Sequence, residues 1–344
     1  MPTEAVTKLY AGLDLHKRNV FCAIIDQGGQ PIYRRRWPAE LPLILDALAP
    51  YRAQLQAVAV ESTFNWYWLV DGLQAVGYPV CLANPSQMGP YSALKQTNDE
   101  TDALWIAELL RLRILPVGYI YPKAQRPLRD MLRRRMLVTG QATQTALSLQ
   151  SMLLRQLGQA VSVAQLNTWT LQQVRAAFAD EHSQYVAAAL LELLQEQRRI
   201  QKALETQALG VMKLQEPFLR LLTIPGIGRI LGLVIALETG PIARFASAGD
   251  YASYCRLVNS RCESDGKKKG ENNRKNGNRY LSWAYVEAAN FAARYSAQAQ
   301  AWFGRKQARS CRAVAVKALG CKLAKAVYYM LRDGVDFDEN KLFA

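Results

Sequence analysis

The order of segments in the first quarter of the chain is the strongest constraint on its fold. Three strand-like segments come first, and helices and strands then alternate. The first strands are apolar and rich in β-branched residues, and a Gln27-Gly28-Gly29 turn precedes the third. The expected strands span 9–15, 20–25, 32–37, 57–61 and 78–82, and the expected helices span 41–52 and 66–76. This order is typical of a ribonuclease-H-like α/β domain, although it is not unique to that fold.

Two acidic residues lie on these predicted strands. Strand alternation places Asp14 on the face opposite Leu13 and Leu15, and a carboxylate within an apolar strand is costly unless it is paired or binds a metal. Glu61 ends the apolar strand 57–61. The two positions lie near each other in a ribonuclease-H-like sheet, so we expect their oxygens to bind Mg²⁺ (or Mn²⁺).

A second acidic pair, Asp99 and Asp102, precedes the predicted helix 104–112. The spacing i, i+3 places both carboxylates on one helical face. One interpretation makes Asp99 a helix N-cap and Asp102 a first-turn acid that the helix dipole favours. The other interpretation places Asp99 and Asp102 in one site with Asp14 and Glu61, because four carboxylates can hold a pair of divalent ions for phosphoryl transfer. We favour the second interpretation.

From about Pro127 the chain changes to long segments rich in Leu, Gln, Arg and Ala. Apolar residues recur there at helical spacing: Leu147, Leu154, Leu157, Leu190, Leu191, Leu194, Ile200 and Leu204. Such helices predict a dimerising antiparallel coiled-coil insertion or an ordinary bundle packed against its own domain. The pattern does not distinguish these two arrangements.

The last part of the chain contains Ile224-Pro225-Gly226-Ile227-Gly228 and then an apolar helix, 230–238. This pattern is typical of a helix-hairpin-helix, in which glycines let the backbone approach DNA phosphates and the helix N-terminus donates amides. We therefore predict that Gly226 and Gly228 bind nucleic acid, although a Pro-Gly turn also begins many ordinary helices. The expected domains are 1–125, 126–217 and 218–344, the last mainly helical.

A basic segment between residues 256 and 279 contains Ser264. Its glycines and asparagines suit a loop that follows phosphates, and we predict that its cations bind nucleic acid: Arg261, Lys267, Lys268, Lys269, Arg274, Lys275 and Arg279. Ser264 is the expected nucleophile, activated by nearby positive charge or a metal because the segment has no histidine to act as a base. Ser260 is a competing nucleophile, and a solvated basic loop is the alternative without chemistry.

The overall charge agrees with a nucleic-acid partner. The 344 residues include 43 Lys and Arg against 28 Asp and Glu, a net charge of +15, which favours a polyanionic partner. No apolar run approaches the roughly 18 residues of a membrane span, and the N-terminus lacks the apolar core of a signal peptide. We expect a cytoplasmic protein, associated with the nucleoid when on DNA, with reduced cysteines and no structural zinc.

In combination these motifs are similar to those of a known family. The Gly12-Leu13-Asp14 strand, Glu61, the Asp99-x-x-Asp102 pair, the hairpin and Glu263-Ser264-x-Gly266 resemble, in order, the DEDD transposases of IS110 and IS1111 insertion sequences. The resemblance implies a RuvC-like domain, a coiled-coil insertion and a C-terminal transposase domain that use Mg²⁺, a catalytic serine and an element-encoded guide (bridge) RNA. Two departures are the shifted Lys95 and the Asp265 beside the serine.

Three hypotheses follow. The first is an RNA-guided recombinase that cuts and rejoins DNA, at element ends and target, through a phosphoserine, as a homodimer that assembles to a tetramer. The second is a metal-dependent Holliday-junction resolvase or nuclease without a serine nucleophile. The third, a non-catalytic nucleic-acid-binding protein, leaves the four acids without a role. We favour the first.

Overall fold

The computed structural model describes residues 7–88, 98–211, 216–258, 262–264, 267–270 and 276–343, with the backbone alone at 211, 262–264 and 267–270. The chain divides into two compact units, residues 1–123 and 124–344. The predicted boundary at 125 lies close to this division. The second unit contains both of the other predicted domains, so the boundary at 217 stays a prediction.

The first unit is built on a six-stranded sheet of order β3-β2-β1-β4-β5-β6. Its strands are β1 (Leu9–Leu15), β2 (Asn19–Ile25), β3 (Pro31–Pro38), β4 (Leu55–Glu61), β5 (Val80–Ala83) and β6 (Val117–Gly118). The first three strands pair antiparallel, whereas β4 runs parallel to β1 and to β5. This arrangement is ribonuclease-H-like and confirms the expected fold of the N-terminal part. The short β6, antiparallel to β5, is an addition to the predicted strands.

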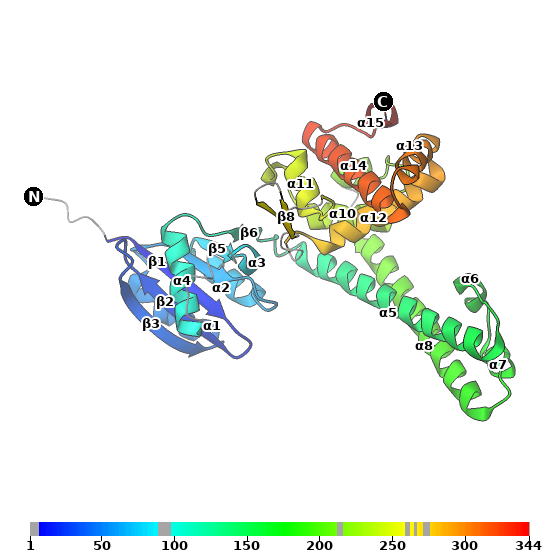
Figure 1. Ribbon diagram of the computed structural model, residues 1–344. Coiled ribbons are helices and arrows are strands. Elements are labelled where there is room, and N and C mark those ends of the chain that lie inside the picture. The colour runs from blue at the N-terminus through cyan, green and yellow to red at the C-terminus, as the bar shows by residue number, and fades with distance from the viewer. Residues whose placement is uncertain are drawn as a thin grey trace, which may run out of the picture. The chain divides into compact units, whose positions relative to one another are not determined.

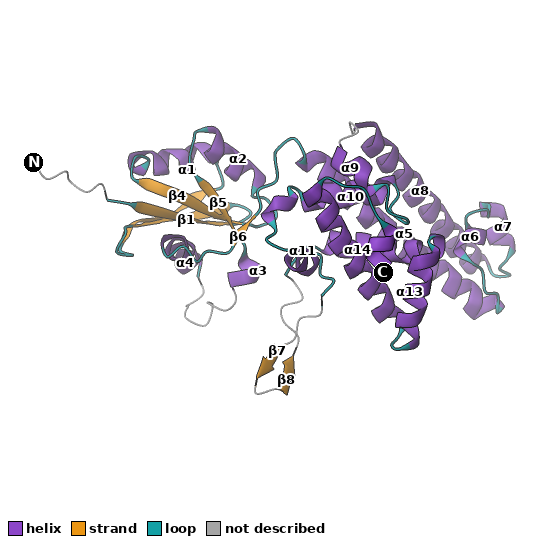
Figure 2. Cartoon of the chain, turned by 90° about the horizontal axis from the view of Figure 1, so that it is seen from above, coloured by secondary structure: helices purple, strands orange, loops and turns teal. Residues whose placement is uncertain are grey.

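The two faces of this sheet carry side chains of different size. Leu13, Leu15 and Val60 pack with α1 (Leu41–Leu48) and α2 (Tyr67–Ala75). The opposite face carries small residues such as Ala23, Ala59 and Ala83 beside Phe21, and α4 (Asp99–Arg111) covers it, as Figure 2 shows. Gly12 is required there, because a Cβ at this position would lie 2.1 Å from the carbonyl oxygen of Ala103. The missing side chain therefore lets α4 lie directly on β1.

The second unit begins with two long helices, α5 (Arg126–Leu157) and α8 (Glu181–Val211), which lie side by side (Figure 1). They run antiparallel, because Arg135 pairs with Glu205 whereas Ala146 packs with Leu194. The short helices α6 (Val163–Leu166) and α7 (Leu171–Ala176) close the far end around a small core of their own. The predicted helical region is thus a helical hairpin, and the coiled coil stays a prediction.

The rest of the second unit is a helical bundle whose core lies mainly among α10, α12 and α14. Its helices are α9 (Glu216–Leu221), α10 (Arg229–Thr239), α11 (Ala248–Tyr254), α12 (Arg279–Tyr295), α13 (Ala297–Ala308), α14 (Arg312–Asp333) and α15 (Glu339–Phe343). A two-stranded hairpin, β7 (Cys262–Ser264) and β8 (Lys267–Gly270), lies between α11 and α12 in the chain. Among the described residues, every helix is too short or too polar to span a bilayer.

Candidate metal centre and serine segment

Asp14 and Glu61 lie at the carboxyl ends of two neighbouring parallel strands. Leu13 of β1 pairs with Val60 of β4, so the register places Asp14 beside Glu61, one residue further on. Residues two apart in a strand share a face. Asp14 is two residues after Gly12 and Glu61 is two residues after Ala59, so both acids lie on the face that α4 covers. The side chain of Asp14 is almost fully buried, with 1% of the residue exposed. The sheet thus brings the two predicted strand acids to one edge.

The first turn of α4 carries the second acidic pair. Its N-cap is Asn98, whose Oδ1 accepts a hydrogen bond from the Thr101 amide at 2.8 Å, while the Asn98 amide donates to Thr101 Oγ1 at 3.1 Å. Asp99 is therefore not the cap, which removes that alternative for it. Its Oδ2 instead accepts a hydrogen bond from Arg36 Nη2 of β3 at 2.7 Å. Asp102 follows one turn later, partly buried, in the part of the helix where the dipole favours an acid.

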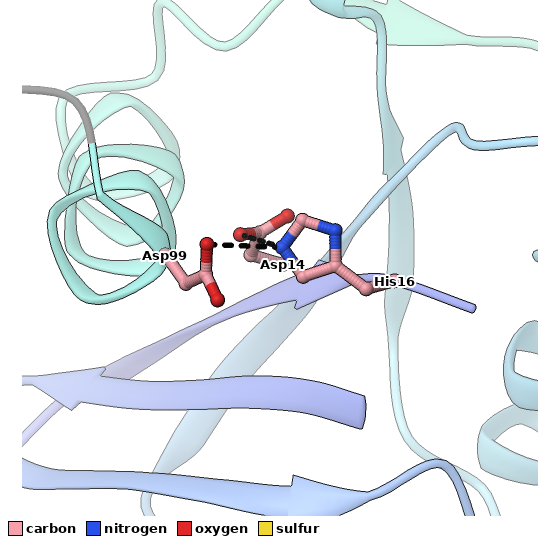
Figure 3. A group of neighbouring side chains, drawn as sticks. All are labelled: Asp14, His16 and Asp99. Atoms are coloured by element: carbon pink, nitrogen blue, oxygen red, sulfur yellow. Dashed lines mark ion pairs between the residues drawn. The ribbon is translucent and has the colours of Figure 1, made fainter. Parts of the chain in front are cut away.

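A histidine that was not among the predicted site residues lies between two of these acids. His16 Nε2 is 3.1 Å from Asp14 Oδ2 and 3.2 Å from Asp99 Oδ1 (Figure 3). The candidate ligand atoms of these three residues all lie within 4.8 Å of one another. Glu61 and Asp102 are outside this group. The available signal was a histidine two residues after Asp14, in a chain with only two histidines.

The donor set fits a divalent cation. Asp14 Oδ2 is buried and accepts no hydrogen bond from the described residues, although His16 Nε2 is close enough for an ion pair. A buried carboxylate oxygen without a hydrogen bond is costly unless a nearby positive charge compensates it. Carboxylate oxygens and an imidazole nitrogen are all metal ligands. The residues present could therefore hold the metal, with Asp14 as the buried ligand.

Arginines of the edge strand β3 face the same helix turn. Arg36 contacts Asp99, and Arg34 Nη1 donates to Glu100 Oε1 at 2.8 Å. Both arginine side chains are more than half exposed, so each pair adds little stability by itself. The arginines instead compensate the charge of an acidic turn and leave one oxygen of Asp99 directed at His16. These arginine contacts were not predictable from the sequence, because β3 reaches this turn only through the sheet.

The structure describes part of the serine segment. Ser264 ends β7, and its backbone pairs with Lys267, while Glu263 pairs with Lys268. The side chains of Ser264, Lys267, Lys268 and Lys269 lie outside the described part of the chain, as do the residues Ser260, Arg261, Arg274 and Lys275 entirely. The roles given to them stay predictions. Arg279 is exposed at the first turn of α12.

The two ends of this segment are held together. The Asn278 amide donates to the Tyr254 carbonyl at 2.6 Å, and Arg256 Nε donates to the Gly277 carbonyl at 3.1 Å. Gly277 has φ +83°, and a Cβ there would lie 2.5 Å from the Tyr254 carbonyl oxygen. The close approach therefore requires a glycine. The chain thus leaves the bundle near Arg256 and re-enters it at Gly277 and Asn278, at one place.

Two family models cover the acids and the serine in this order. The model of the DEDD transposases of IS110 elements, described as "Transposase", matches residues 11–157. The model described as "Transposase IS116/IS110/IS902 family" matches residues 219–303. The chain belongs to the IS110 family of transposases. It is therefore a DNA-acting enzyme, and a family of the DEDD type implies a divalent metal. A search of curated proteins gave no significant match.

In this transposase a buried ionic network holds the end of the serine segment. Glu238 of α10 accepts hydrogen bonds from Arg129 Nε at 3.0 Å, Arg133 Nε at 2.6 Å and Asn278 Nδ2 at 2.7 Å. Asn278 also caps α12, where its Oδ1 accepts from the Tyr280 and Leu281 amides. Burial alone would raise the pKa of Glu238, but Arg133, Arg129 and Asn278 together hold this pKa below its ordinary value. The carboxylate thus stays charged and fixes Asn278.

The predicted helix-hairpin-helix of the transposase corresponds to α9, the turn 222–228 and α10. Gly226 has φ +94°, and a Cβ there would lie 2.5 Å from the Ala292 amide nitrogen and 2.7 Å from the Ala288 carbonyl oxygen. Packing against α12 therefore requires this glycine whether or not it binds DNA. Gly228 is exposed at the N-terminus of α10, and no described atom outside the turn would contact its Cβ. Its predicted contact with nucleic acid stays open.

Proposed function

We propose that this transposase is an RNA-guided recombinase that cuts and rejoins DNA through a covalent Ser264–DNA phosphoester. The observation that carries the chemistry is the acidic group of the first unit, where α4 brings Asp99 to Asp14 across Gly12. In a DNA transposase such a group is suited to phosphoryl transfer. Asp14 and Asp99 would hold Mg²⁺ (or Mn²⁺), with Glu61 and Asp102 completing the ligand set.

The bound cation would supply positive charge that stabilises the oxygens of the transferring phosphoryl group. The other residues have separate roles. Ser264 Oγ attacks a backbone phosphorus and loses its proton, the Oγ–P bond forms, and the P–O bond to one DNA strand breaks. The released strand end takes up a proton as a hydroxyl. A hydroxyl of another strand then attacks the phosphoserine and restores Ser264. The energy of the broken bond is kept in the phosphoester, so rejoining needs no external energy source.

The basic residues of the serine segment would hold the two strands during this exchange. Lys267, Lys268 and Lys269 follow one another in β8, whose backbone pairs with β7. Three adjacent positive charges in the sequence are suited to contacting DNA phosphates. Arg261, Arg274, Lys275 and Arg279 extend the same charge on both sides in the sequence.

The alternative is a metal-dependent junction resolvase or nuclease. One observation favours it: the group of Asp14, His16 and Asp99 lies within the first compact unit, whereas the serine segment belongs to the second. Water would then be the nucleophile. The two mechanisms differ in whether DNA becomes covalently attached to the protein.

Covalent attachment is the direct test. End-labelled element DNA is incubated with the protein and its guide RNA, and adducts are separated under denaturing conditions. We expect an adduct with the wild-type protein and with Ser260→Ala, and no adduct with Ser264→Ala, although this variant still binds DNA and RNA. An adduct with Ser264→Ala would move the nucleophile to another residue. Strand cleavage by Ser264→Ala without any adduct would establish the nuclease alternative.

The remaining partners are part of the same proposal. A net charge of +15 is suited to binding a structured RNA as well as DNA, and sequencing RNA that copurifies with the cytoplasmic protein would identify the guide. We propose that the helical hairpin, within residues 127–215, forms a homodimer that pairs to a tetramer on DNA. Leu147 and Leu154 of α5 support this interface, because 57% and 55% of these apolar residues are exposed.

A further inference from the structure

The position of the His16 ring matches that of a metal ligand. Its Nε2 is 3.1 Å from Asp14 Oδ2 and 3.2 Å from Asp99 Oδ1 (Figure 3). Adjacent ligands of an octahedral cation, at metal–ligand distances of about 2.1–2.2 Å, are separated by about 3.0–3.1 Å. His16 Nε2 therefore already has the spacing of a neighbouring ligand to each of the two carboxylate oxygens. The same spacing also occurs in an ion pair between a histidine and a carboxylate.

The hydrogen bonding at Asp14 favours a ligand over an ion pair. Asp14 Oδ2 is buried and accepts no hydrogen bond from the described residues, so the His16 ring approaches without donating to it. A carboxylate oxygen at this depth is costly when neither a hydrogen bond nor a bound cation compensates its loss of hydration. A cation placed between the three atoms would instead use the free electron pairs of both the oxygen and the nitrogen.

The backbone of His16 is held independently of its side chain. The His16 amide donates to the Asn19 carbonyl at 2.9 Å, and Asn65 Nδ2 donates to the His16 carbonyl at 3.1 Å. These bonds fix the turn between β1 and β2, so the ring projects from a defined position. The side chain is 44% exposed, and this opening leaves room for water or a phosphate oxygen at the remaining positions of the cation.

We propose that His16 is a ligand of the divalent cation, together with Asp14 and Asp99, and that it biases the centre toward Mn²⁺ over Mg²⁺. This inference rests on the proposed metal centre. Mg²⁺ prefers oxygen ligands, whereas an imidazole nitrogen binds first-row transition ions well. Mn²⁺ accepts both donor types and is one of the ions that act in metal-dependent catalysis. A centre of carboxylates alone would lack this bias.

Pulsed electron paramagnetic resonance of bound Mn²⁺ tests the assignment, because it detects a directly coordinated imidazole nitrogen. The chain offers a matched control, since its only other histidine, His182, is exposed at the start of α8. The full chain is freed of metal with a chelator and loaded with Mn²⁺. We expect the nitrogen signal in the wild-type protein and in His182→Gln, and its loss in His16→Gln.

Binding titrations provide the second measurement. We expect His16→Gln to bind Mn²⁺ about tenfold more weakly, with a smaller loss for Mg²⁺, and His182→Gln to bind both ions as the wild type does. Circular dichroism verifies that each variant is folded. The electron paramagnetic resonance spectrum of the wild-type protein tests the assignment without any variant. The wild type could bind Mn²⁺ without showing a nitrogen signal, while Asp14→Asn abolishes this binding. That result would overturn the role of His16 and leave the metal centre intact. Absence of both Mn²⁺ and Mg²⁺ binding would overturn the metal centre itself.

Discussion

At the residue scale, Gly12 sets the distance between the two halves of the candidate metal centre. Replacing it with alanine places a Cβ 2.1 Å from the Ala103 carbonyl oxygen, so α4 has to move away from β1. We expect Gly12→Ala to lower the free energy of unfolding by about 1–3 kcal/mol, as overpacking does, and to weaken Mn²⁺ binding because Asp99 moves with the helix. Urea denaturation and metal titration measure the two effects.

Gly140 of α5 provides the control for this substitution. No described atom would contact a Cβ there, and alanine favours a helix interior more than glycine does. Gly140→Ala should therefore keep or slightly raise stability and leave metal binding unchanged. If Gly12→Ala binds Mn²⁺ as tightly as the wild type, the close contact of α4 with β1 is not what positions Asp99.

The same residues show how far the sequence identifies this site. Asp14 and Asp99 stood out because each is an acid next to an apolar strand or helix, and the structure brings them together through His16. His16 itself lies one residue beyond the end of β1, where alternation no longer predicts a direction. Arg36 reaches Asp99 across the sheet from a strand 63 residues earlier. Periodicity describes one element at a time, so these contacts of His16 and Arg36 with distant elements were not predictable.

At the scale of elements, Glu238 joins α10 and α5 to the N-terminus of α12. Replacing it with glutamine removes the negative charge that pairs with two arginines, the buried Arg129 and the partly buried Arg133. We expect Glu238→Gln to lower the free energy of unfolding by about 3–5 kcal/mol, as breaking a buried ion pair does. Chemical denaturation measures this loss, and Glu196→Gln, which breaks the exposed pair with Arg199, should change little.

The pH dependence of stability follows from the same carboxylate. The pKa of Glu238 is lower in the folded protein than its ordinary value of 4.5. The stabilising contribution is therefore fully present above pH 4.5 and is lost as the pH falls through the folded-state pKa. We expect the free energy of unfolding of the wild type to fall more steeply below pH 4.5 than that of Glu238→Gln. Parallel curves for the two proteins, from denaturation at several pH values, would contradict a lowered pKa at Glu238.

The helices also show what a periodic pattern leaves undetermined. The leucines predicted a long helical region, and α5 and α8 confirm it. Helical spacing predicted an apolar face on each helix but not which element packs against that face. Leu191 and Leu194 pack within the chain, whereas Leu147 and Leu154 are exposed. Similarly, Gly226 was predicted from its turn to approach DNA, but its close neighbour is α12, which lies more than 50 residues further along the chain.

At the scale of the whole molecule, the acids and the serine belong to different compact units. Asp14 lies in residues 1–123 and Ser264 in residues 124–344, and each unit has its own hydrophobic core. A unit with its own core keeps its site when the other unit carries a substitution. Two protomers of the proposed dimer can therefore each contribute one intact half of an active site.

Mixing two inactive variants tests such composite sites. We expect Asp14→Ala and Ser264→Ala to be inactive alone and to recover strand exchange when mixed, because one protomer supplies the acids and the other supplies the serine. Asp14→Ala mixed with Asp99→Ala is the matched control, since both changes lie in the first unit and no combination of protomers restores the metal centre. Differently tagged proteins and a pull-down establish that mixed oligomers form. Mixed oligomers without recovered activity would show that each protomer carries a self-contained site.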